Sequence, residues 1–261
     1  MNPALRTAAT GMMAQQTRTE VIANNLANVN TTGFKRSRAQ FQDLLYQTLQ
    51  GPSVLGGEDA KTATAIQVGR GTHLSGILRE NAQGSLEATG RPLDVAIEGE
   101  GYFQIQTASG VTAYTRDGGF QISDQGVLTT NSGNQVLPGI KIPAEATQVS
   151  ISQTGVVSYT KAGKETVEIG RIEVARFTNP SGLEAQGGNL FTETPASGRA
   201  ITGYPGDESM GILMQGSLEG SNVEVVQEMV DKISAQRAYE LNSKSVKATD
   251  EMSQVANEIV R

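Results

Sequence analysis

Side chains able to perform acid–base or metal chemistry are few in this chain. The single histidine, His73, has no serine or aspartate beside it in a catalytic arrangement, so we interpret it as a surface residue. There are no cysteines, which excludes disulfides and thiolate metal sites, and one histidine is too few for a multi-histidine zinc site. The sequence therefore predicts no metal centre built from these residues.

Acidic residues are the remaining candidates for catalysis. Asp94, Glu98 and Glu100 could supply the paired carboxylates of a glycoside-cleaving enzyme. Asp94 and Glu98 alternate with apolar neighbours, however, which is typical of the solvated face of a strand. The turn at 117–119 lacks the further oxygen ligands of a calcium loop, and no complete glycine motif for phosphates or dinucleotides is present. We therefore expect neither an enzyme nor a cofactor.

Composition narrows the class of protein further. Apolar residues make up 37% of the 261 residues and aromatic residues only 5%, which favours an elongated protein over one with a single large core. The net charge of −6 argues against a broad nucleic-acid surface. No run of 18 apolar residues predicts a transmembrane segment, and the first 20 residues lack the apolar core of a secretory signal. We expect a cytoplasmic protein, or one exported without a cleaved signal.

The N-terminal stretch reads as a long amphipathic helix. Asn2 and Pro3 are a typical helix start, and the asparagines at 24, 25 and 28 followed by Gly33 predict its end near Asn28. Apolar and small residues recur every three or four positions, which indicates a coiled-coil-type seam. The seam comprises Leu5, Ala8, Met12, Gln15, Thr19, Ile22, Leu26 and Val29.

The C-terminal stretch predicts a second, longer helix. Ser221 and Glu224 have the spacing of a capping box, and neither glycine nor proline occurs from Val223 to Arg261. Its seam shifts register once, near Ser234. The apolar members predicted to form the assembly seam are Val226, Val230, Leu241, Met252, Val255 and Ile259. Because each seam is thin, we expect the two helices to pair and to need further partners.

Residues 34–92 read as an extended arm. A short apolar island surrounds Phe41 and Leu45, and Ile66–Val68 has the pattern of a short strand. The basic residues Lys35, Arg36 and Arg38 are interpreted as a solvated face. The arm has too few apolar residues for a core of its own and too many for a free linker. Those predicted to fill gaps between neighbours and stiffen an assembly are Leu49, Val54, Leu55, Ile66 and Val68.

Residues 93–202 predict an antiparallel β domain. Short alternating segments are separated by turn signals every 8–12 residues, a spacing typical of sandwiches and open barrels. Residues 114–116 and 120–122 read as two strands joined by a tight turn. The expected fold class is α+β: residues 1–33 and 222–261 form a coiled-coil-like inner domain, 34–92 the arm, 93–202 an outer β domain, and 203–221 a return segment.

The two ends also carry a family signature. Residues 22–35, IANNLANVNTTGFK, resemble the N-terminal motif of bacterial flagellar rod and hook proteins, and residues 229–252 resemble that family's terminal helix. Residues 91–103 and 114–118 resemble its central β motifs. The motif positions carried over at the N-terminus are Asn24, Asn25, Leu26, Ala27, Asn28, Gly33 and Phe34.

The resemblance implies a structural subunit of a helical tube. Length and the segment 41–71 are most similar to those of a distal rod subunit of the flagellar basal body, which forms a rigid tube across the periplasm, transmits torque from motor to hook and conducts exported subunits. The implied partners are other copies of the chain, proximal rod proteins, the hook or hook–rod junction, the surrounding L/P ring bushing and the type III export gate. Phe41 and Leu45 resemble the element read by that gate, although packing explains them equally well.

Two alternatives stay open at this stage. Another rod or hook protein of the same family would share these motifs. A β-domain enzyme with a helical dimerisation hairpin would share the order of the elements but would not form tubes.

Overall fold

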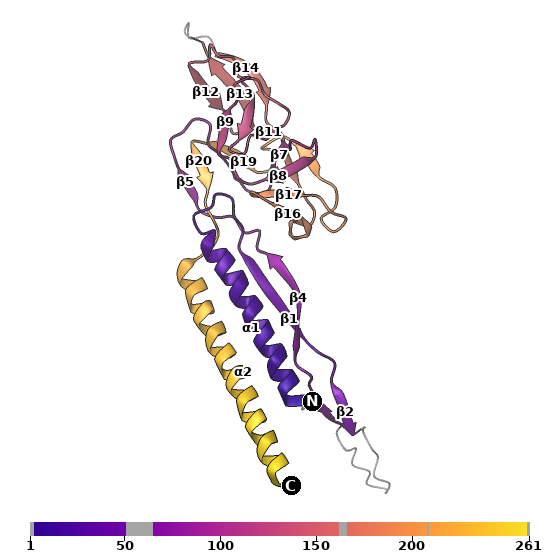
Figure 1. Ribbon diagram of the computed structural model, residues 1–261. Coiled ribbons are helices and arrows are strands. Elements are labelled where there is room, and N and C mark those ends of the chain that lie inside the picture. The colour runs from indigo at the N-terminus through magenta and orange to yellow at the C-terminus, as the bar shows by residue number, and fades with distance from the viewer. Residues whose placement is uncertain (1–2, 51–64, 162–165, 208, 260–261) are drawn as a thin grey trace, which may run out of the picture. The chain divides into compact units, whose positions relative to one another are not determined.

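The computed structural model describes residues 3–50, 65–161, 166–207 and 209–259 and confirms the α+β class. It contains one long helix near each end of the chain and mostly antiparallel strands between them (Figure 1). The chain divides into two compact units. Unit 1 comprises Met1–Leu26, Ser37–Leu78 and Val225–Arg261, and unit 2 comprises Ala27–Arg36 and Arg79–Glu224.

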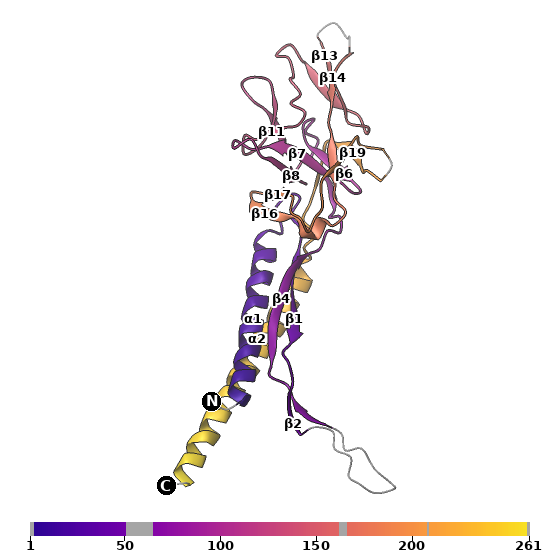
Figure 2. The same ribbon diagram turned by 90° about the vertical axis from the view of Figure 1, so that its right-hand side faces the viewer.

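Unit 1 contains both helices. Helix α1 spans Pro3–Ala27 and helix α2 spans Val225–Ile259, so the prediction of a long helix at each end is confirmed. The helices lie side by side and run in opposite directions (Figures 1 and 2). Gly33 follows α1 with φ of 68°, a conformation that glycine adopts without steric cost.

The predicted capping box at the start of α2 is wrong. The helix begins at Val225, and the Ser221 hydroxyl accepts a hydrogen bond from the amide of Val223 at 3.3 Å. The intervening Asn222 makes hydrogen bonds to other segments of unit 2. These bonds explain why residues 221–224 stay outside the helix.

The arm strands complete unit 1. Strand β1 (Ser37–Asp43) pairs with β4 (Thr72–Arg79), and β2 (Gln47–Gln50) pairs with β3 (Ile66–Val68). The predicted strand at 66–68 is thus confirmed, and the apolar island around Phe41 includes the end of a strand. Strands β1 and β4 lie along α1 in both views (Figures 1 and 2).

Unit 2 contains the β domain. A nine-stranded sheet has the order β16-β17-β8-β7-β11-β10-β9, with β15 pairing with β7 and β18, while β12-β13-β14, β19-β6 and β20-β5 form smaller sheets. The strands are β5 (Leu86–Ala88), β6 (Val95–Glu98), β7 (Tyr102–Gln106), β8 (Thr112–Thr115), β9 (Phe120–Ile122), β10 (Leu128–Thr130), β11 (Gln135–Val136), β12 (Gln148–Ile151), β13 (Val156–Thr160), β14 (Thr166–Arg171), β15 (Val174–Arg176), β16 (Glu184–Gly187), β17 (Leu190–Thr192), β18 (Ile201–Gly203), β19 (Ile212–Gln215) and β20 (Ser217–Glu219), with a 3₁₀ turn at Pro180–Gly182.

The predicted hairpin at 114–122 is wrong in its pairing. Strand β8 pairs with β7 and β17, whereas β9 pairs with β10. The turn between β8 and β9 contacts another segment: the amide of Val95 donates to the carbonyl of Gly118 at 3.0 Å. A Cβ on Gly118 would overlap the Val95 carbonyl, so glycine permits this approach.

Unit 2 contains two clusters of buried hydrophobic residues. Phe103 and Phe120 are buried and meet edge to face, with ring centroids 5.0 Å apart. A second cluster contains Tyr102, Tyr114 and Phe177, and the Phe177 ring is perpendicular to both tyrosine rings to within about 21°. Side chains from the nine-stranded sheet and from β6, β12, β13 and β19 fill the first cluster.

The prediction that Asp94 lies on the solvated face of a strand is wrong. The Asp94 side chain is 1% exposed, and it accepts a hydrogen bond of 2.7 Å from the Thr89 hydroxyl. Arg91 lies 3.7 Å away as an ion-pair partner. The following residues, Val95–Ile97, are all buried, so the alternating pattern did not mark a wet face here. Glu98 is exposed, as predicted.

Candidate assembly surfaces

The two helices of unit 1 meet through small and polar residues. Ala14 on α1 and Ala235 on α2 are buried, and a Cβ on Gly11 would lie 2.8 Å from the Asn242 amide nitrogen. Arg18 donates to Asp231 at 2.8 Å across the pair. Small residues allow the close approach, but they bury little apolar area.

The predicted C-terminal seam lies on the exposed side of α2. Val226 is 70% exposed, Leu241 64% and Met252 64%. Val230 and Val255 are also exposed, as are the neighbouring Met229 and Ile233, while the structure does not describe the Ile259 side chain. At helical spacing these residues point away from Ala235, which faces α1. The α2 outer face, as we call it, therefore leaves a long apolar surface uncovered within the chain.

The predicted N-terminal seam has a different environment. Ile22 is buried, and Leu5, Met12 and Leu26 are half-buried. Part of this burial comes from the arm strands. The Thr10 hydroxyl accepts a hydrogen bond from the Thr72 amide at 3.3 Å, and a Cβ on Gly71 would overlap that hydroxyl. Helix α1 is thus covered on one side by α2 and on another by the arm.

Asn25 joins three elements of unit 1. Its amide oxygen accepts from the Ser37 backbone N–H at 2.9 Å, and its amide nitrogen donates to the Ser37 carbonyl at 2.8 Å. The same nitrogen donates to Glu228 of α2 at 3.2 Å. Because Asn25 and Glu228 are both buried, this arrangement fixes the start of β1 against both helices.

The other family-motif residues have mixed environments. Asn24 and Ala27 are exposed, and Phe34 is half-buried. The Asn28 side chain accepts a hydrogen bond from Thr31 at 3.2 Å.

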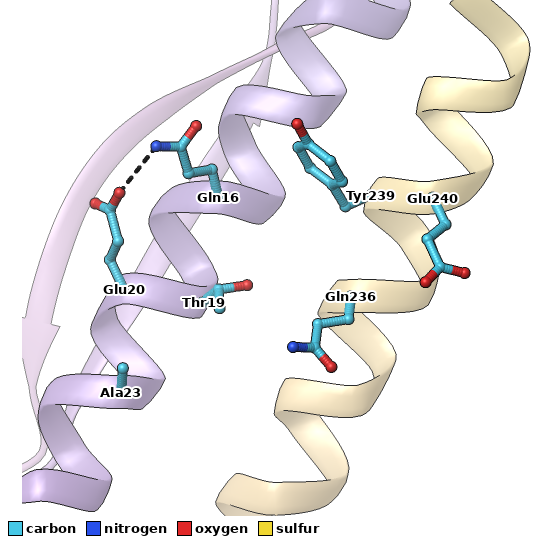
Figure 3. Close-up of a pocket in the computed structure, with 7 residues that line it drawn as sticks. All are labelled: Gln16, Thr19, Glu20, Ala23, Gln236, Tyr239 and Glu240. Carbon is cyan, nitrogen blue, oxygen red and sulfur yellow. Dashed lines mark hydrogen bonds between the residues drawn. The ribbon is translucent and has the colours of Figure 1, made fainter.

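A groove runs between the two helices (Figure 3). Tyr239 projects from α2 into the space beside α1, and the Gln16 amide donates to Glu20 at 3.1 Å along the α1 wall. The remaining lining residues are Thr19, Ala23, Gln236 and Glu240. Six of the seven lining residues carry a polar group, whereas small-molecule sites are lined mainly by hydrophobic and aromatic side chains, so we assign no small-molecule site here.

The arm strands expose much of their apolar surface. Leu45 is 88% exposed, and Leu49, Ile66 and Val68 are exposed as well. Phe41 is half-buried in β1. Val54 and Leu55 lie outside the described residues. The arm therefore presents a second apolar surface in unit 1. Its described strands contain no buried residues and form no core of their own.

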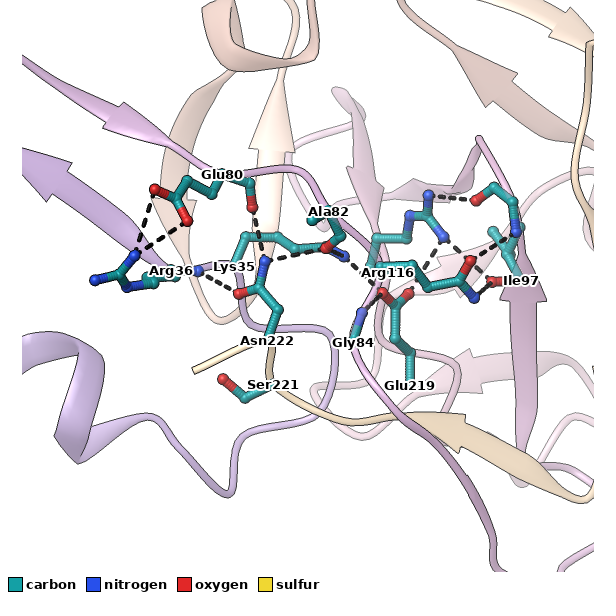
Figure 4. A network of polar contacts seen from close by, with 12 residues as sticks. Lys35, Arg36, Glu80, Ala82, Gly84, Ile97, Arg116, Glu219, Ser221 and Asn222 are labelled. Atoms are coloured by element: carbon teal, nitrogen blue, oxygen red, sulfur yellow. Dashed lines mark hydrogen bonds and ion pairs between the residues drawn. The ribbon is translucent and has the colours of Figure 1, made fainter. Parts of the chain in front are cut away.

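A buried ion cluster in unit 2 was missed by the sequence reasoning. Lys35, interpreted as part of a solvated basic face, is buried, and its ammonium lies 2.5 Å from Glu219. Arg116 contacts the other carboxylate oxygen of Glu219 at 3.2 Å (Figure 4). Arg36 is half-buried against Glu80 and only Arg38 is exposed. Nothing in the local sequence indicates the pair, because its members are 184 positions apart.

Backbone groups complete this cluster. The Lys35 ammonium also donates to the Ala82 carbonyl at 2.8 Å, and Arg116 donates to the carbonyls of Ile97 and Gly99 at 3.3 and 2.7 Å. The Gly84 amide donates to Glu219 at 3.0 Å. Burial lowers the pKa of Lys35 from its usual value, and the adjacent Glu219 opposes that shift.

Asn222 ties further segments together beside the cluster (Figure 4). Its side-chain oxygen accepts from the Arg36 amide at 2.7 Å, and its side-chain nitrogen donates to the carbonyls of Glu80 and Ala82 at 2.9 and 3.0 Å. All members of these contacts belong to unit 2.

The described residues contain neither a metal site nor a membrane-spanning helix. No three histidine, cysteine, aspartate or glutamate side chains there lie close enough together to bind a metal ion. No described helix is both long and apolar enough to span a membrane. His73 is exposed, as predicted.

Family models match three parts of the chain. Residues 5–35 match the model for flagella basal body rod proteins, residues 96–159 that for the flagellar hook protein FlgE/F/G D1 domain, and residues 214–259 that for the flagellar basal body rod FlgEFG protein C-terminal region. These ranges cover most of α1, the strands from β6 to β13, and all of α2.

Full-length relatives distinguish between members of this family. The flagellar basal-body rod protein FlgG of Borreliella burgdorferi is 48% identical over 264 residues, which cover 100% of both chains. In Caulobacter vibrioides, FlgG is 48% identical over 98% of both chains, whereas FlgF is 33% identical over 99% of this chain and 98% of its own. The chain belongs to the FlgG family of flagellar basal-body rod proteins. The predicted family and the predicted role of structural rod subunit are confirmed.

Proposed function

We propose that this FlgG-family chain assembles with copies of itself into a rigid helical tube, the distal rod, which transmits torque from motor to hook and conducts exported subunits. Identical subunits joined by head-to-tail contacts that do not close produce such a filament. In this proposal residues 1–33 and 222–261 form the coiled-coil-like inner domain, 34–92 the arm, 93–202 the outer β domain and 203–221 the return segment.

The α2 outer face is the observation that carries the proposal. Apolar residues recur along it from Val226 to Val255 and are exposed in the single chain. Exposed apolar residues that recur along one side of a helix indicate a protein interaction site, and the exposed Arg237 and Lys244, which lie between them at helical spacing, would need polar partners there. These residues lie outside the α1–α2 contact and stay exposed in the single chain, whereas copies of the same helix pair would bury them.

Further partners follow from the family. We propose contacts with proximal rod proteins at one end of the tube, with the hook or hook–rod junction at the other, and with the L/P ring bushing around it. The chain would reach the periplasmic rod through the type III export gate without a cleaved signal, with Phe41 and Leu45 as the candidate gate element. The high exposure of Leu45 leaves it free to serve in such recognition. No catalytic role is proposed.

A charge on the α2 outer face tests the proposal. Leu241→Asp would bury an unpaired carboxylate between packed copies, which costs several kcal/mol if it is not compensated. Gln254→Asp makes the same change of charge at an exposed polar position on another side of α2. We expect negative-stain images of wild-type and Gln254→Asp protein to show tubes, and those of Leu241→Asp to show none. Normal tubes from Leu241→Asp would contradict the proposed surface.

A further inference from the structure

The chain passes between its two units four times, after Leu26, Arg36, Leu78 and Glu224. Within unit 2, the contacts described above gather beside three of these passages. Arg36 is the last residue before one of them, Glu80 is the second unit 2 residue after another, and Asn222 lies two positions before the fourth. Segments that are far apart in sequence but adjacent to the passages are therefore held in one place.

Hydrogen bonds connect these segments to one another directly. The Asn222 side chain joins Arg36 to the backbone of 80–82, and the Glu80 amide donates to the Arg36 carbonyl at 2.8 Å. Arg36 also pairs with the Glu80 carboxylate at 3.3 Å. The Gly33 amide donates to the Glu219 carbonyl at 2.8 Å.

The ion cluster gives this network an all-or-none character. The Lys35 and Glu219 side chains are 1% and 0% exposed, so neither charge can turn to water while the segments stay docked. Glu219 supplies the carboxylate that both cations contact, so withdrawal of 217–224 would leave Lys35 and Arg116 buried without it, which is strongly unfavourable. Withdrawal of 28–36 or 80–84 would remove hydrogen bonds that the Lys35 ammonium and the Glu219 carboxylate make there, so the loss of one segment destabilises the docking of the others.

We propose that Lys35, Glu219, Arg116 and Asn222 form a fastener that makes residues 28–36, 80–84 and 217–224 dock and undock as one cooperative element of unit 2. The role in load transmission rests on the proposed function: in a subunit that transmits torque, force entering unit 2 through one passage would be shared among all the docked segments. The cooperative docking itself requires only the single chain.

Close backbone packing supports a single docked arrangement. A Cβ on Gly33 would lie 2.8 Å from the carbonyl carbon of Arg116, and a Cβ on Gly84 would overlap the carbonyl of Gly220. These approaches leave no room for a neighbouring register. The segments are consequently either fully docked or released.

Hydrogen–deuterium exchange of the full-length monomer tests the fastener. Glu219→Gln removes the carboxylate that both Lys35 and Arg116 contact and leaves two buried cations without that partner. The matched control is Glu145→Gln, whose ion pair with Lys161 has the same 2.5 Å separation but side chains that are 65% and 57% exposed. We expect Glu219→Gln to accelerate exchange at least tenfold in all three segments together, with less than a twofold change in β7 and β8. Glu145→Gln should leave the three segments unchanged.

A milder variant keeps the proposal testable if Glu219→Gln does not fold. Asn222→Ala removes the hydrogen bonds between segments without leaving a buried charge, so we expect the same three segments to exchange faster by a smaller factor. Acceleration confined to the mutated segment, acceleration spread evenly over unit 2, or no acceleration would each overturn the proposal. Because the measurement uses monomer, failure of tube assembly would not affect its outcome.

Discussion

Unit 1 and unit 2 use their apolar residues in opposite ways. In unit 2, Phe103, Phe120 and Ile105 are completely enclosed, and the buried cluster around them extends across several sheets. In unit 1, large apolar residues such as Val226 and Leu241 on α2 are exposed, and few of the unit's described apolar side chains are buried. One unit thus fills its interior with its own side chains, whereas the other leaves apolar surface uncovered.

This difference indicates where each unit obtains its stability. Burial of a large apolar side chain contributes about 1.5–3 kcal/mol, and unit 2 collects many such contributions within one chain. Unit 1 has small residues and a few polar contacts at its helix contact, so ordering its long helices is poorly offset in the monomer. We expect its stability to come mainly from neighbouring copies.

One substitution in each unit should separate monomer stability from tube assembly. Phe103→Ala removes a fully buried ring and should lower the free energy of unfolding of the monomer by about 3–5 kcal/mol. Leu241→Ala, at an exposed position, should change that value by less than about 0.5 kcal/mol but should weaken tube assembly. Chemical denaturation of monomer and sedimentation of tubes would measure the two effects. A large loss of monomer stability in Leu241→Ala would break the comparison.

The buried lysine makes the stability of unit 2 depend on pH. The folded-state pKa of Lys35 is below its unfolded value, so the cost of burying the charged form is present at neutral pH and is relieved as pH rises toward 10.5. The stability of wild type relative to Lys35→Met should therefore increase over this range, by at most about 1.4 kcal/mol per pH unit. Denaturation of both proteins at several pH values checks this. A constant difference would show that Lys35 does not titrate in this range.

We expect the arm to determine the bending stiffness of the assembled tube and to have little effect on folding of the monomer. Deleting residues 49–65 removes part of β2 and the segment before β3 while leaving unit 2 and Phe41–Leu45 intact. We expect a subunit that folds with unchanged monomer stability and is exported, and tubes that bend more easily because packing between neighbours is lost. Persistence length measured on isolated tubes would decide. Tubes as stiff as wild type would refute the rigidity role, and a variant retained in the cytoplasm would show that the export element is misplaced.

Elements with regular periodicity could be predicted from the sequence. The helices α1 and α2 have long seams, and β3 is followed by Gly69 and Gly71, so their positions could be predicted. Strand pairing was harder, because β8 and β9 look like a hairpin locally but pair with distant strands. The choice of partner depends on the turn at 117–119 packing against Val95, which no local pattern records.

The charged residues show the same limit. Lys35 and Arg36 look like an ordinary basic surface, and Asp94 alternates with apolar residues as an exposed strand residue would. Their burial depends on partners brought together by the fold, such as Glu219 for Lys35 and Thr89 for Asp94. Likewise Ser221 has capping-box spacing, yet the bonds of Asn222 delay the start of α2. At the positions where the local sequence patterns gave a wrong prediction, long-range polar contacts therefore determined the structure.

Hydrogen–deuterium exchange of the wild-type chain, as monomer and as assembled tube, would show whether unit 2 is stable alone while unit 1 depends on neighbouring copies. We expect fast exchange of α1, α2 and the arm strands in the monomer, slow exchange of β6, β7 and β8 in both states, and strong protection of α1 and α2 only in the tube. Helices as protected in the monomer as the β-sheet core would show that unit 1 does not need neighbouring copies.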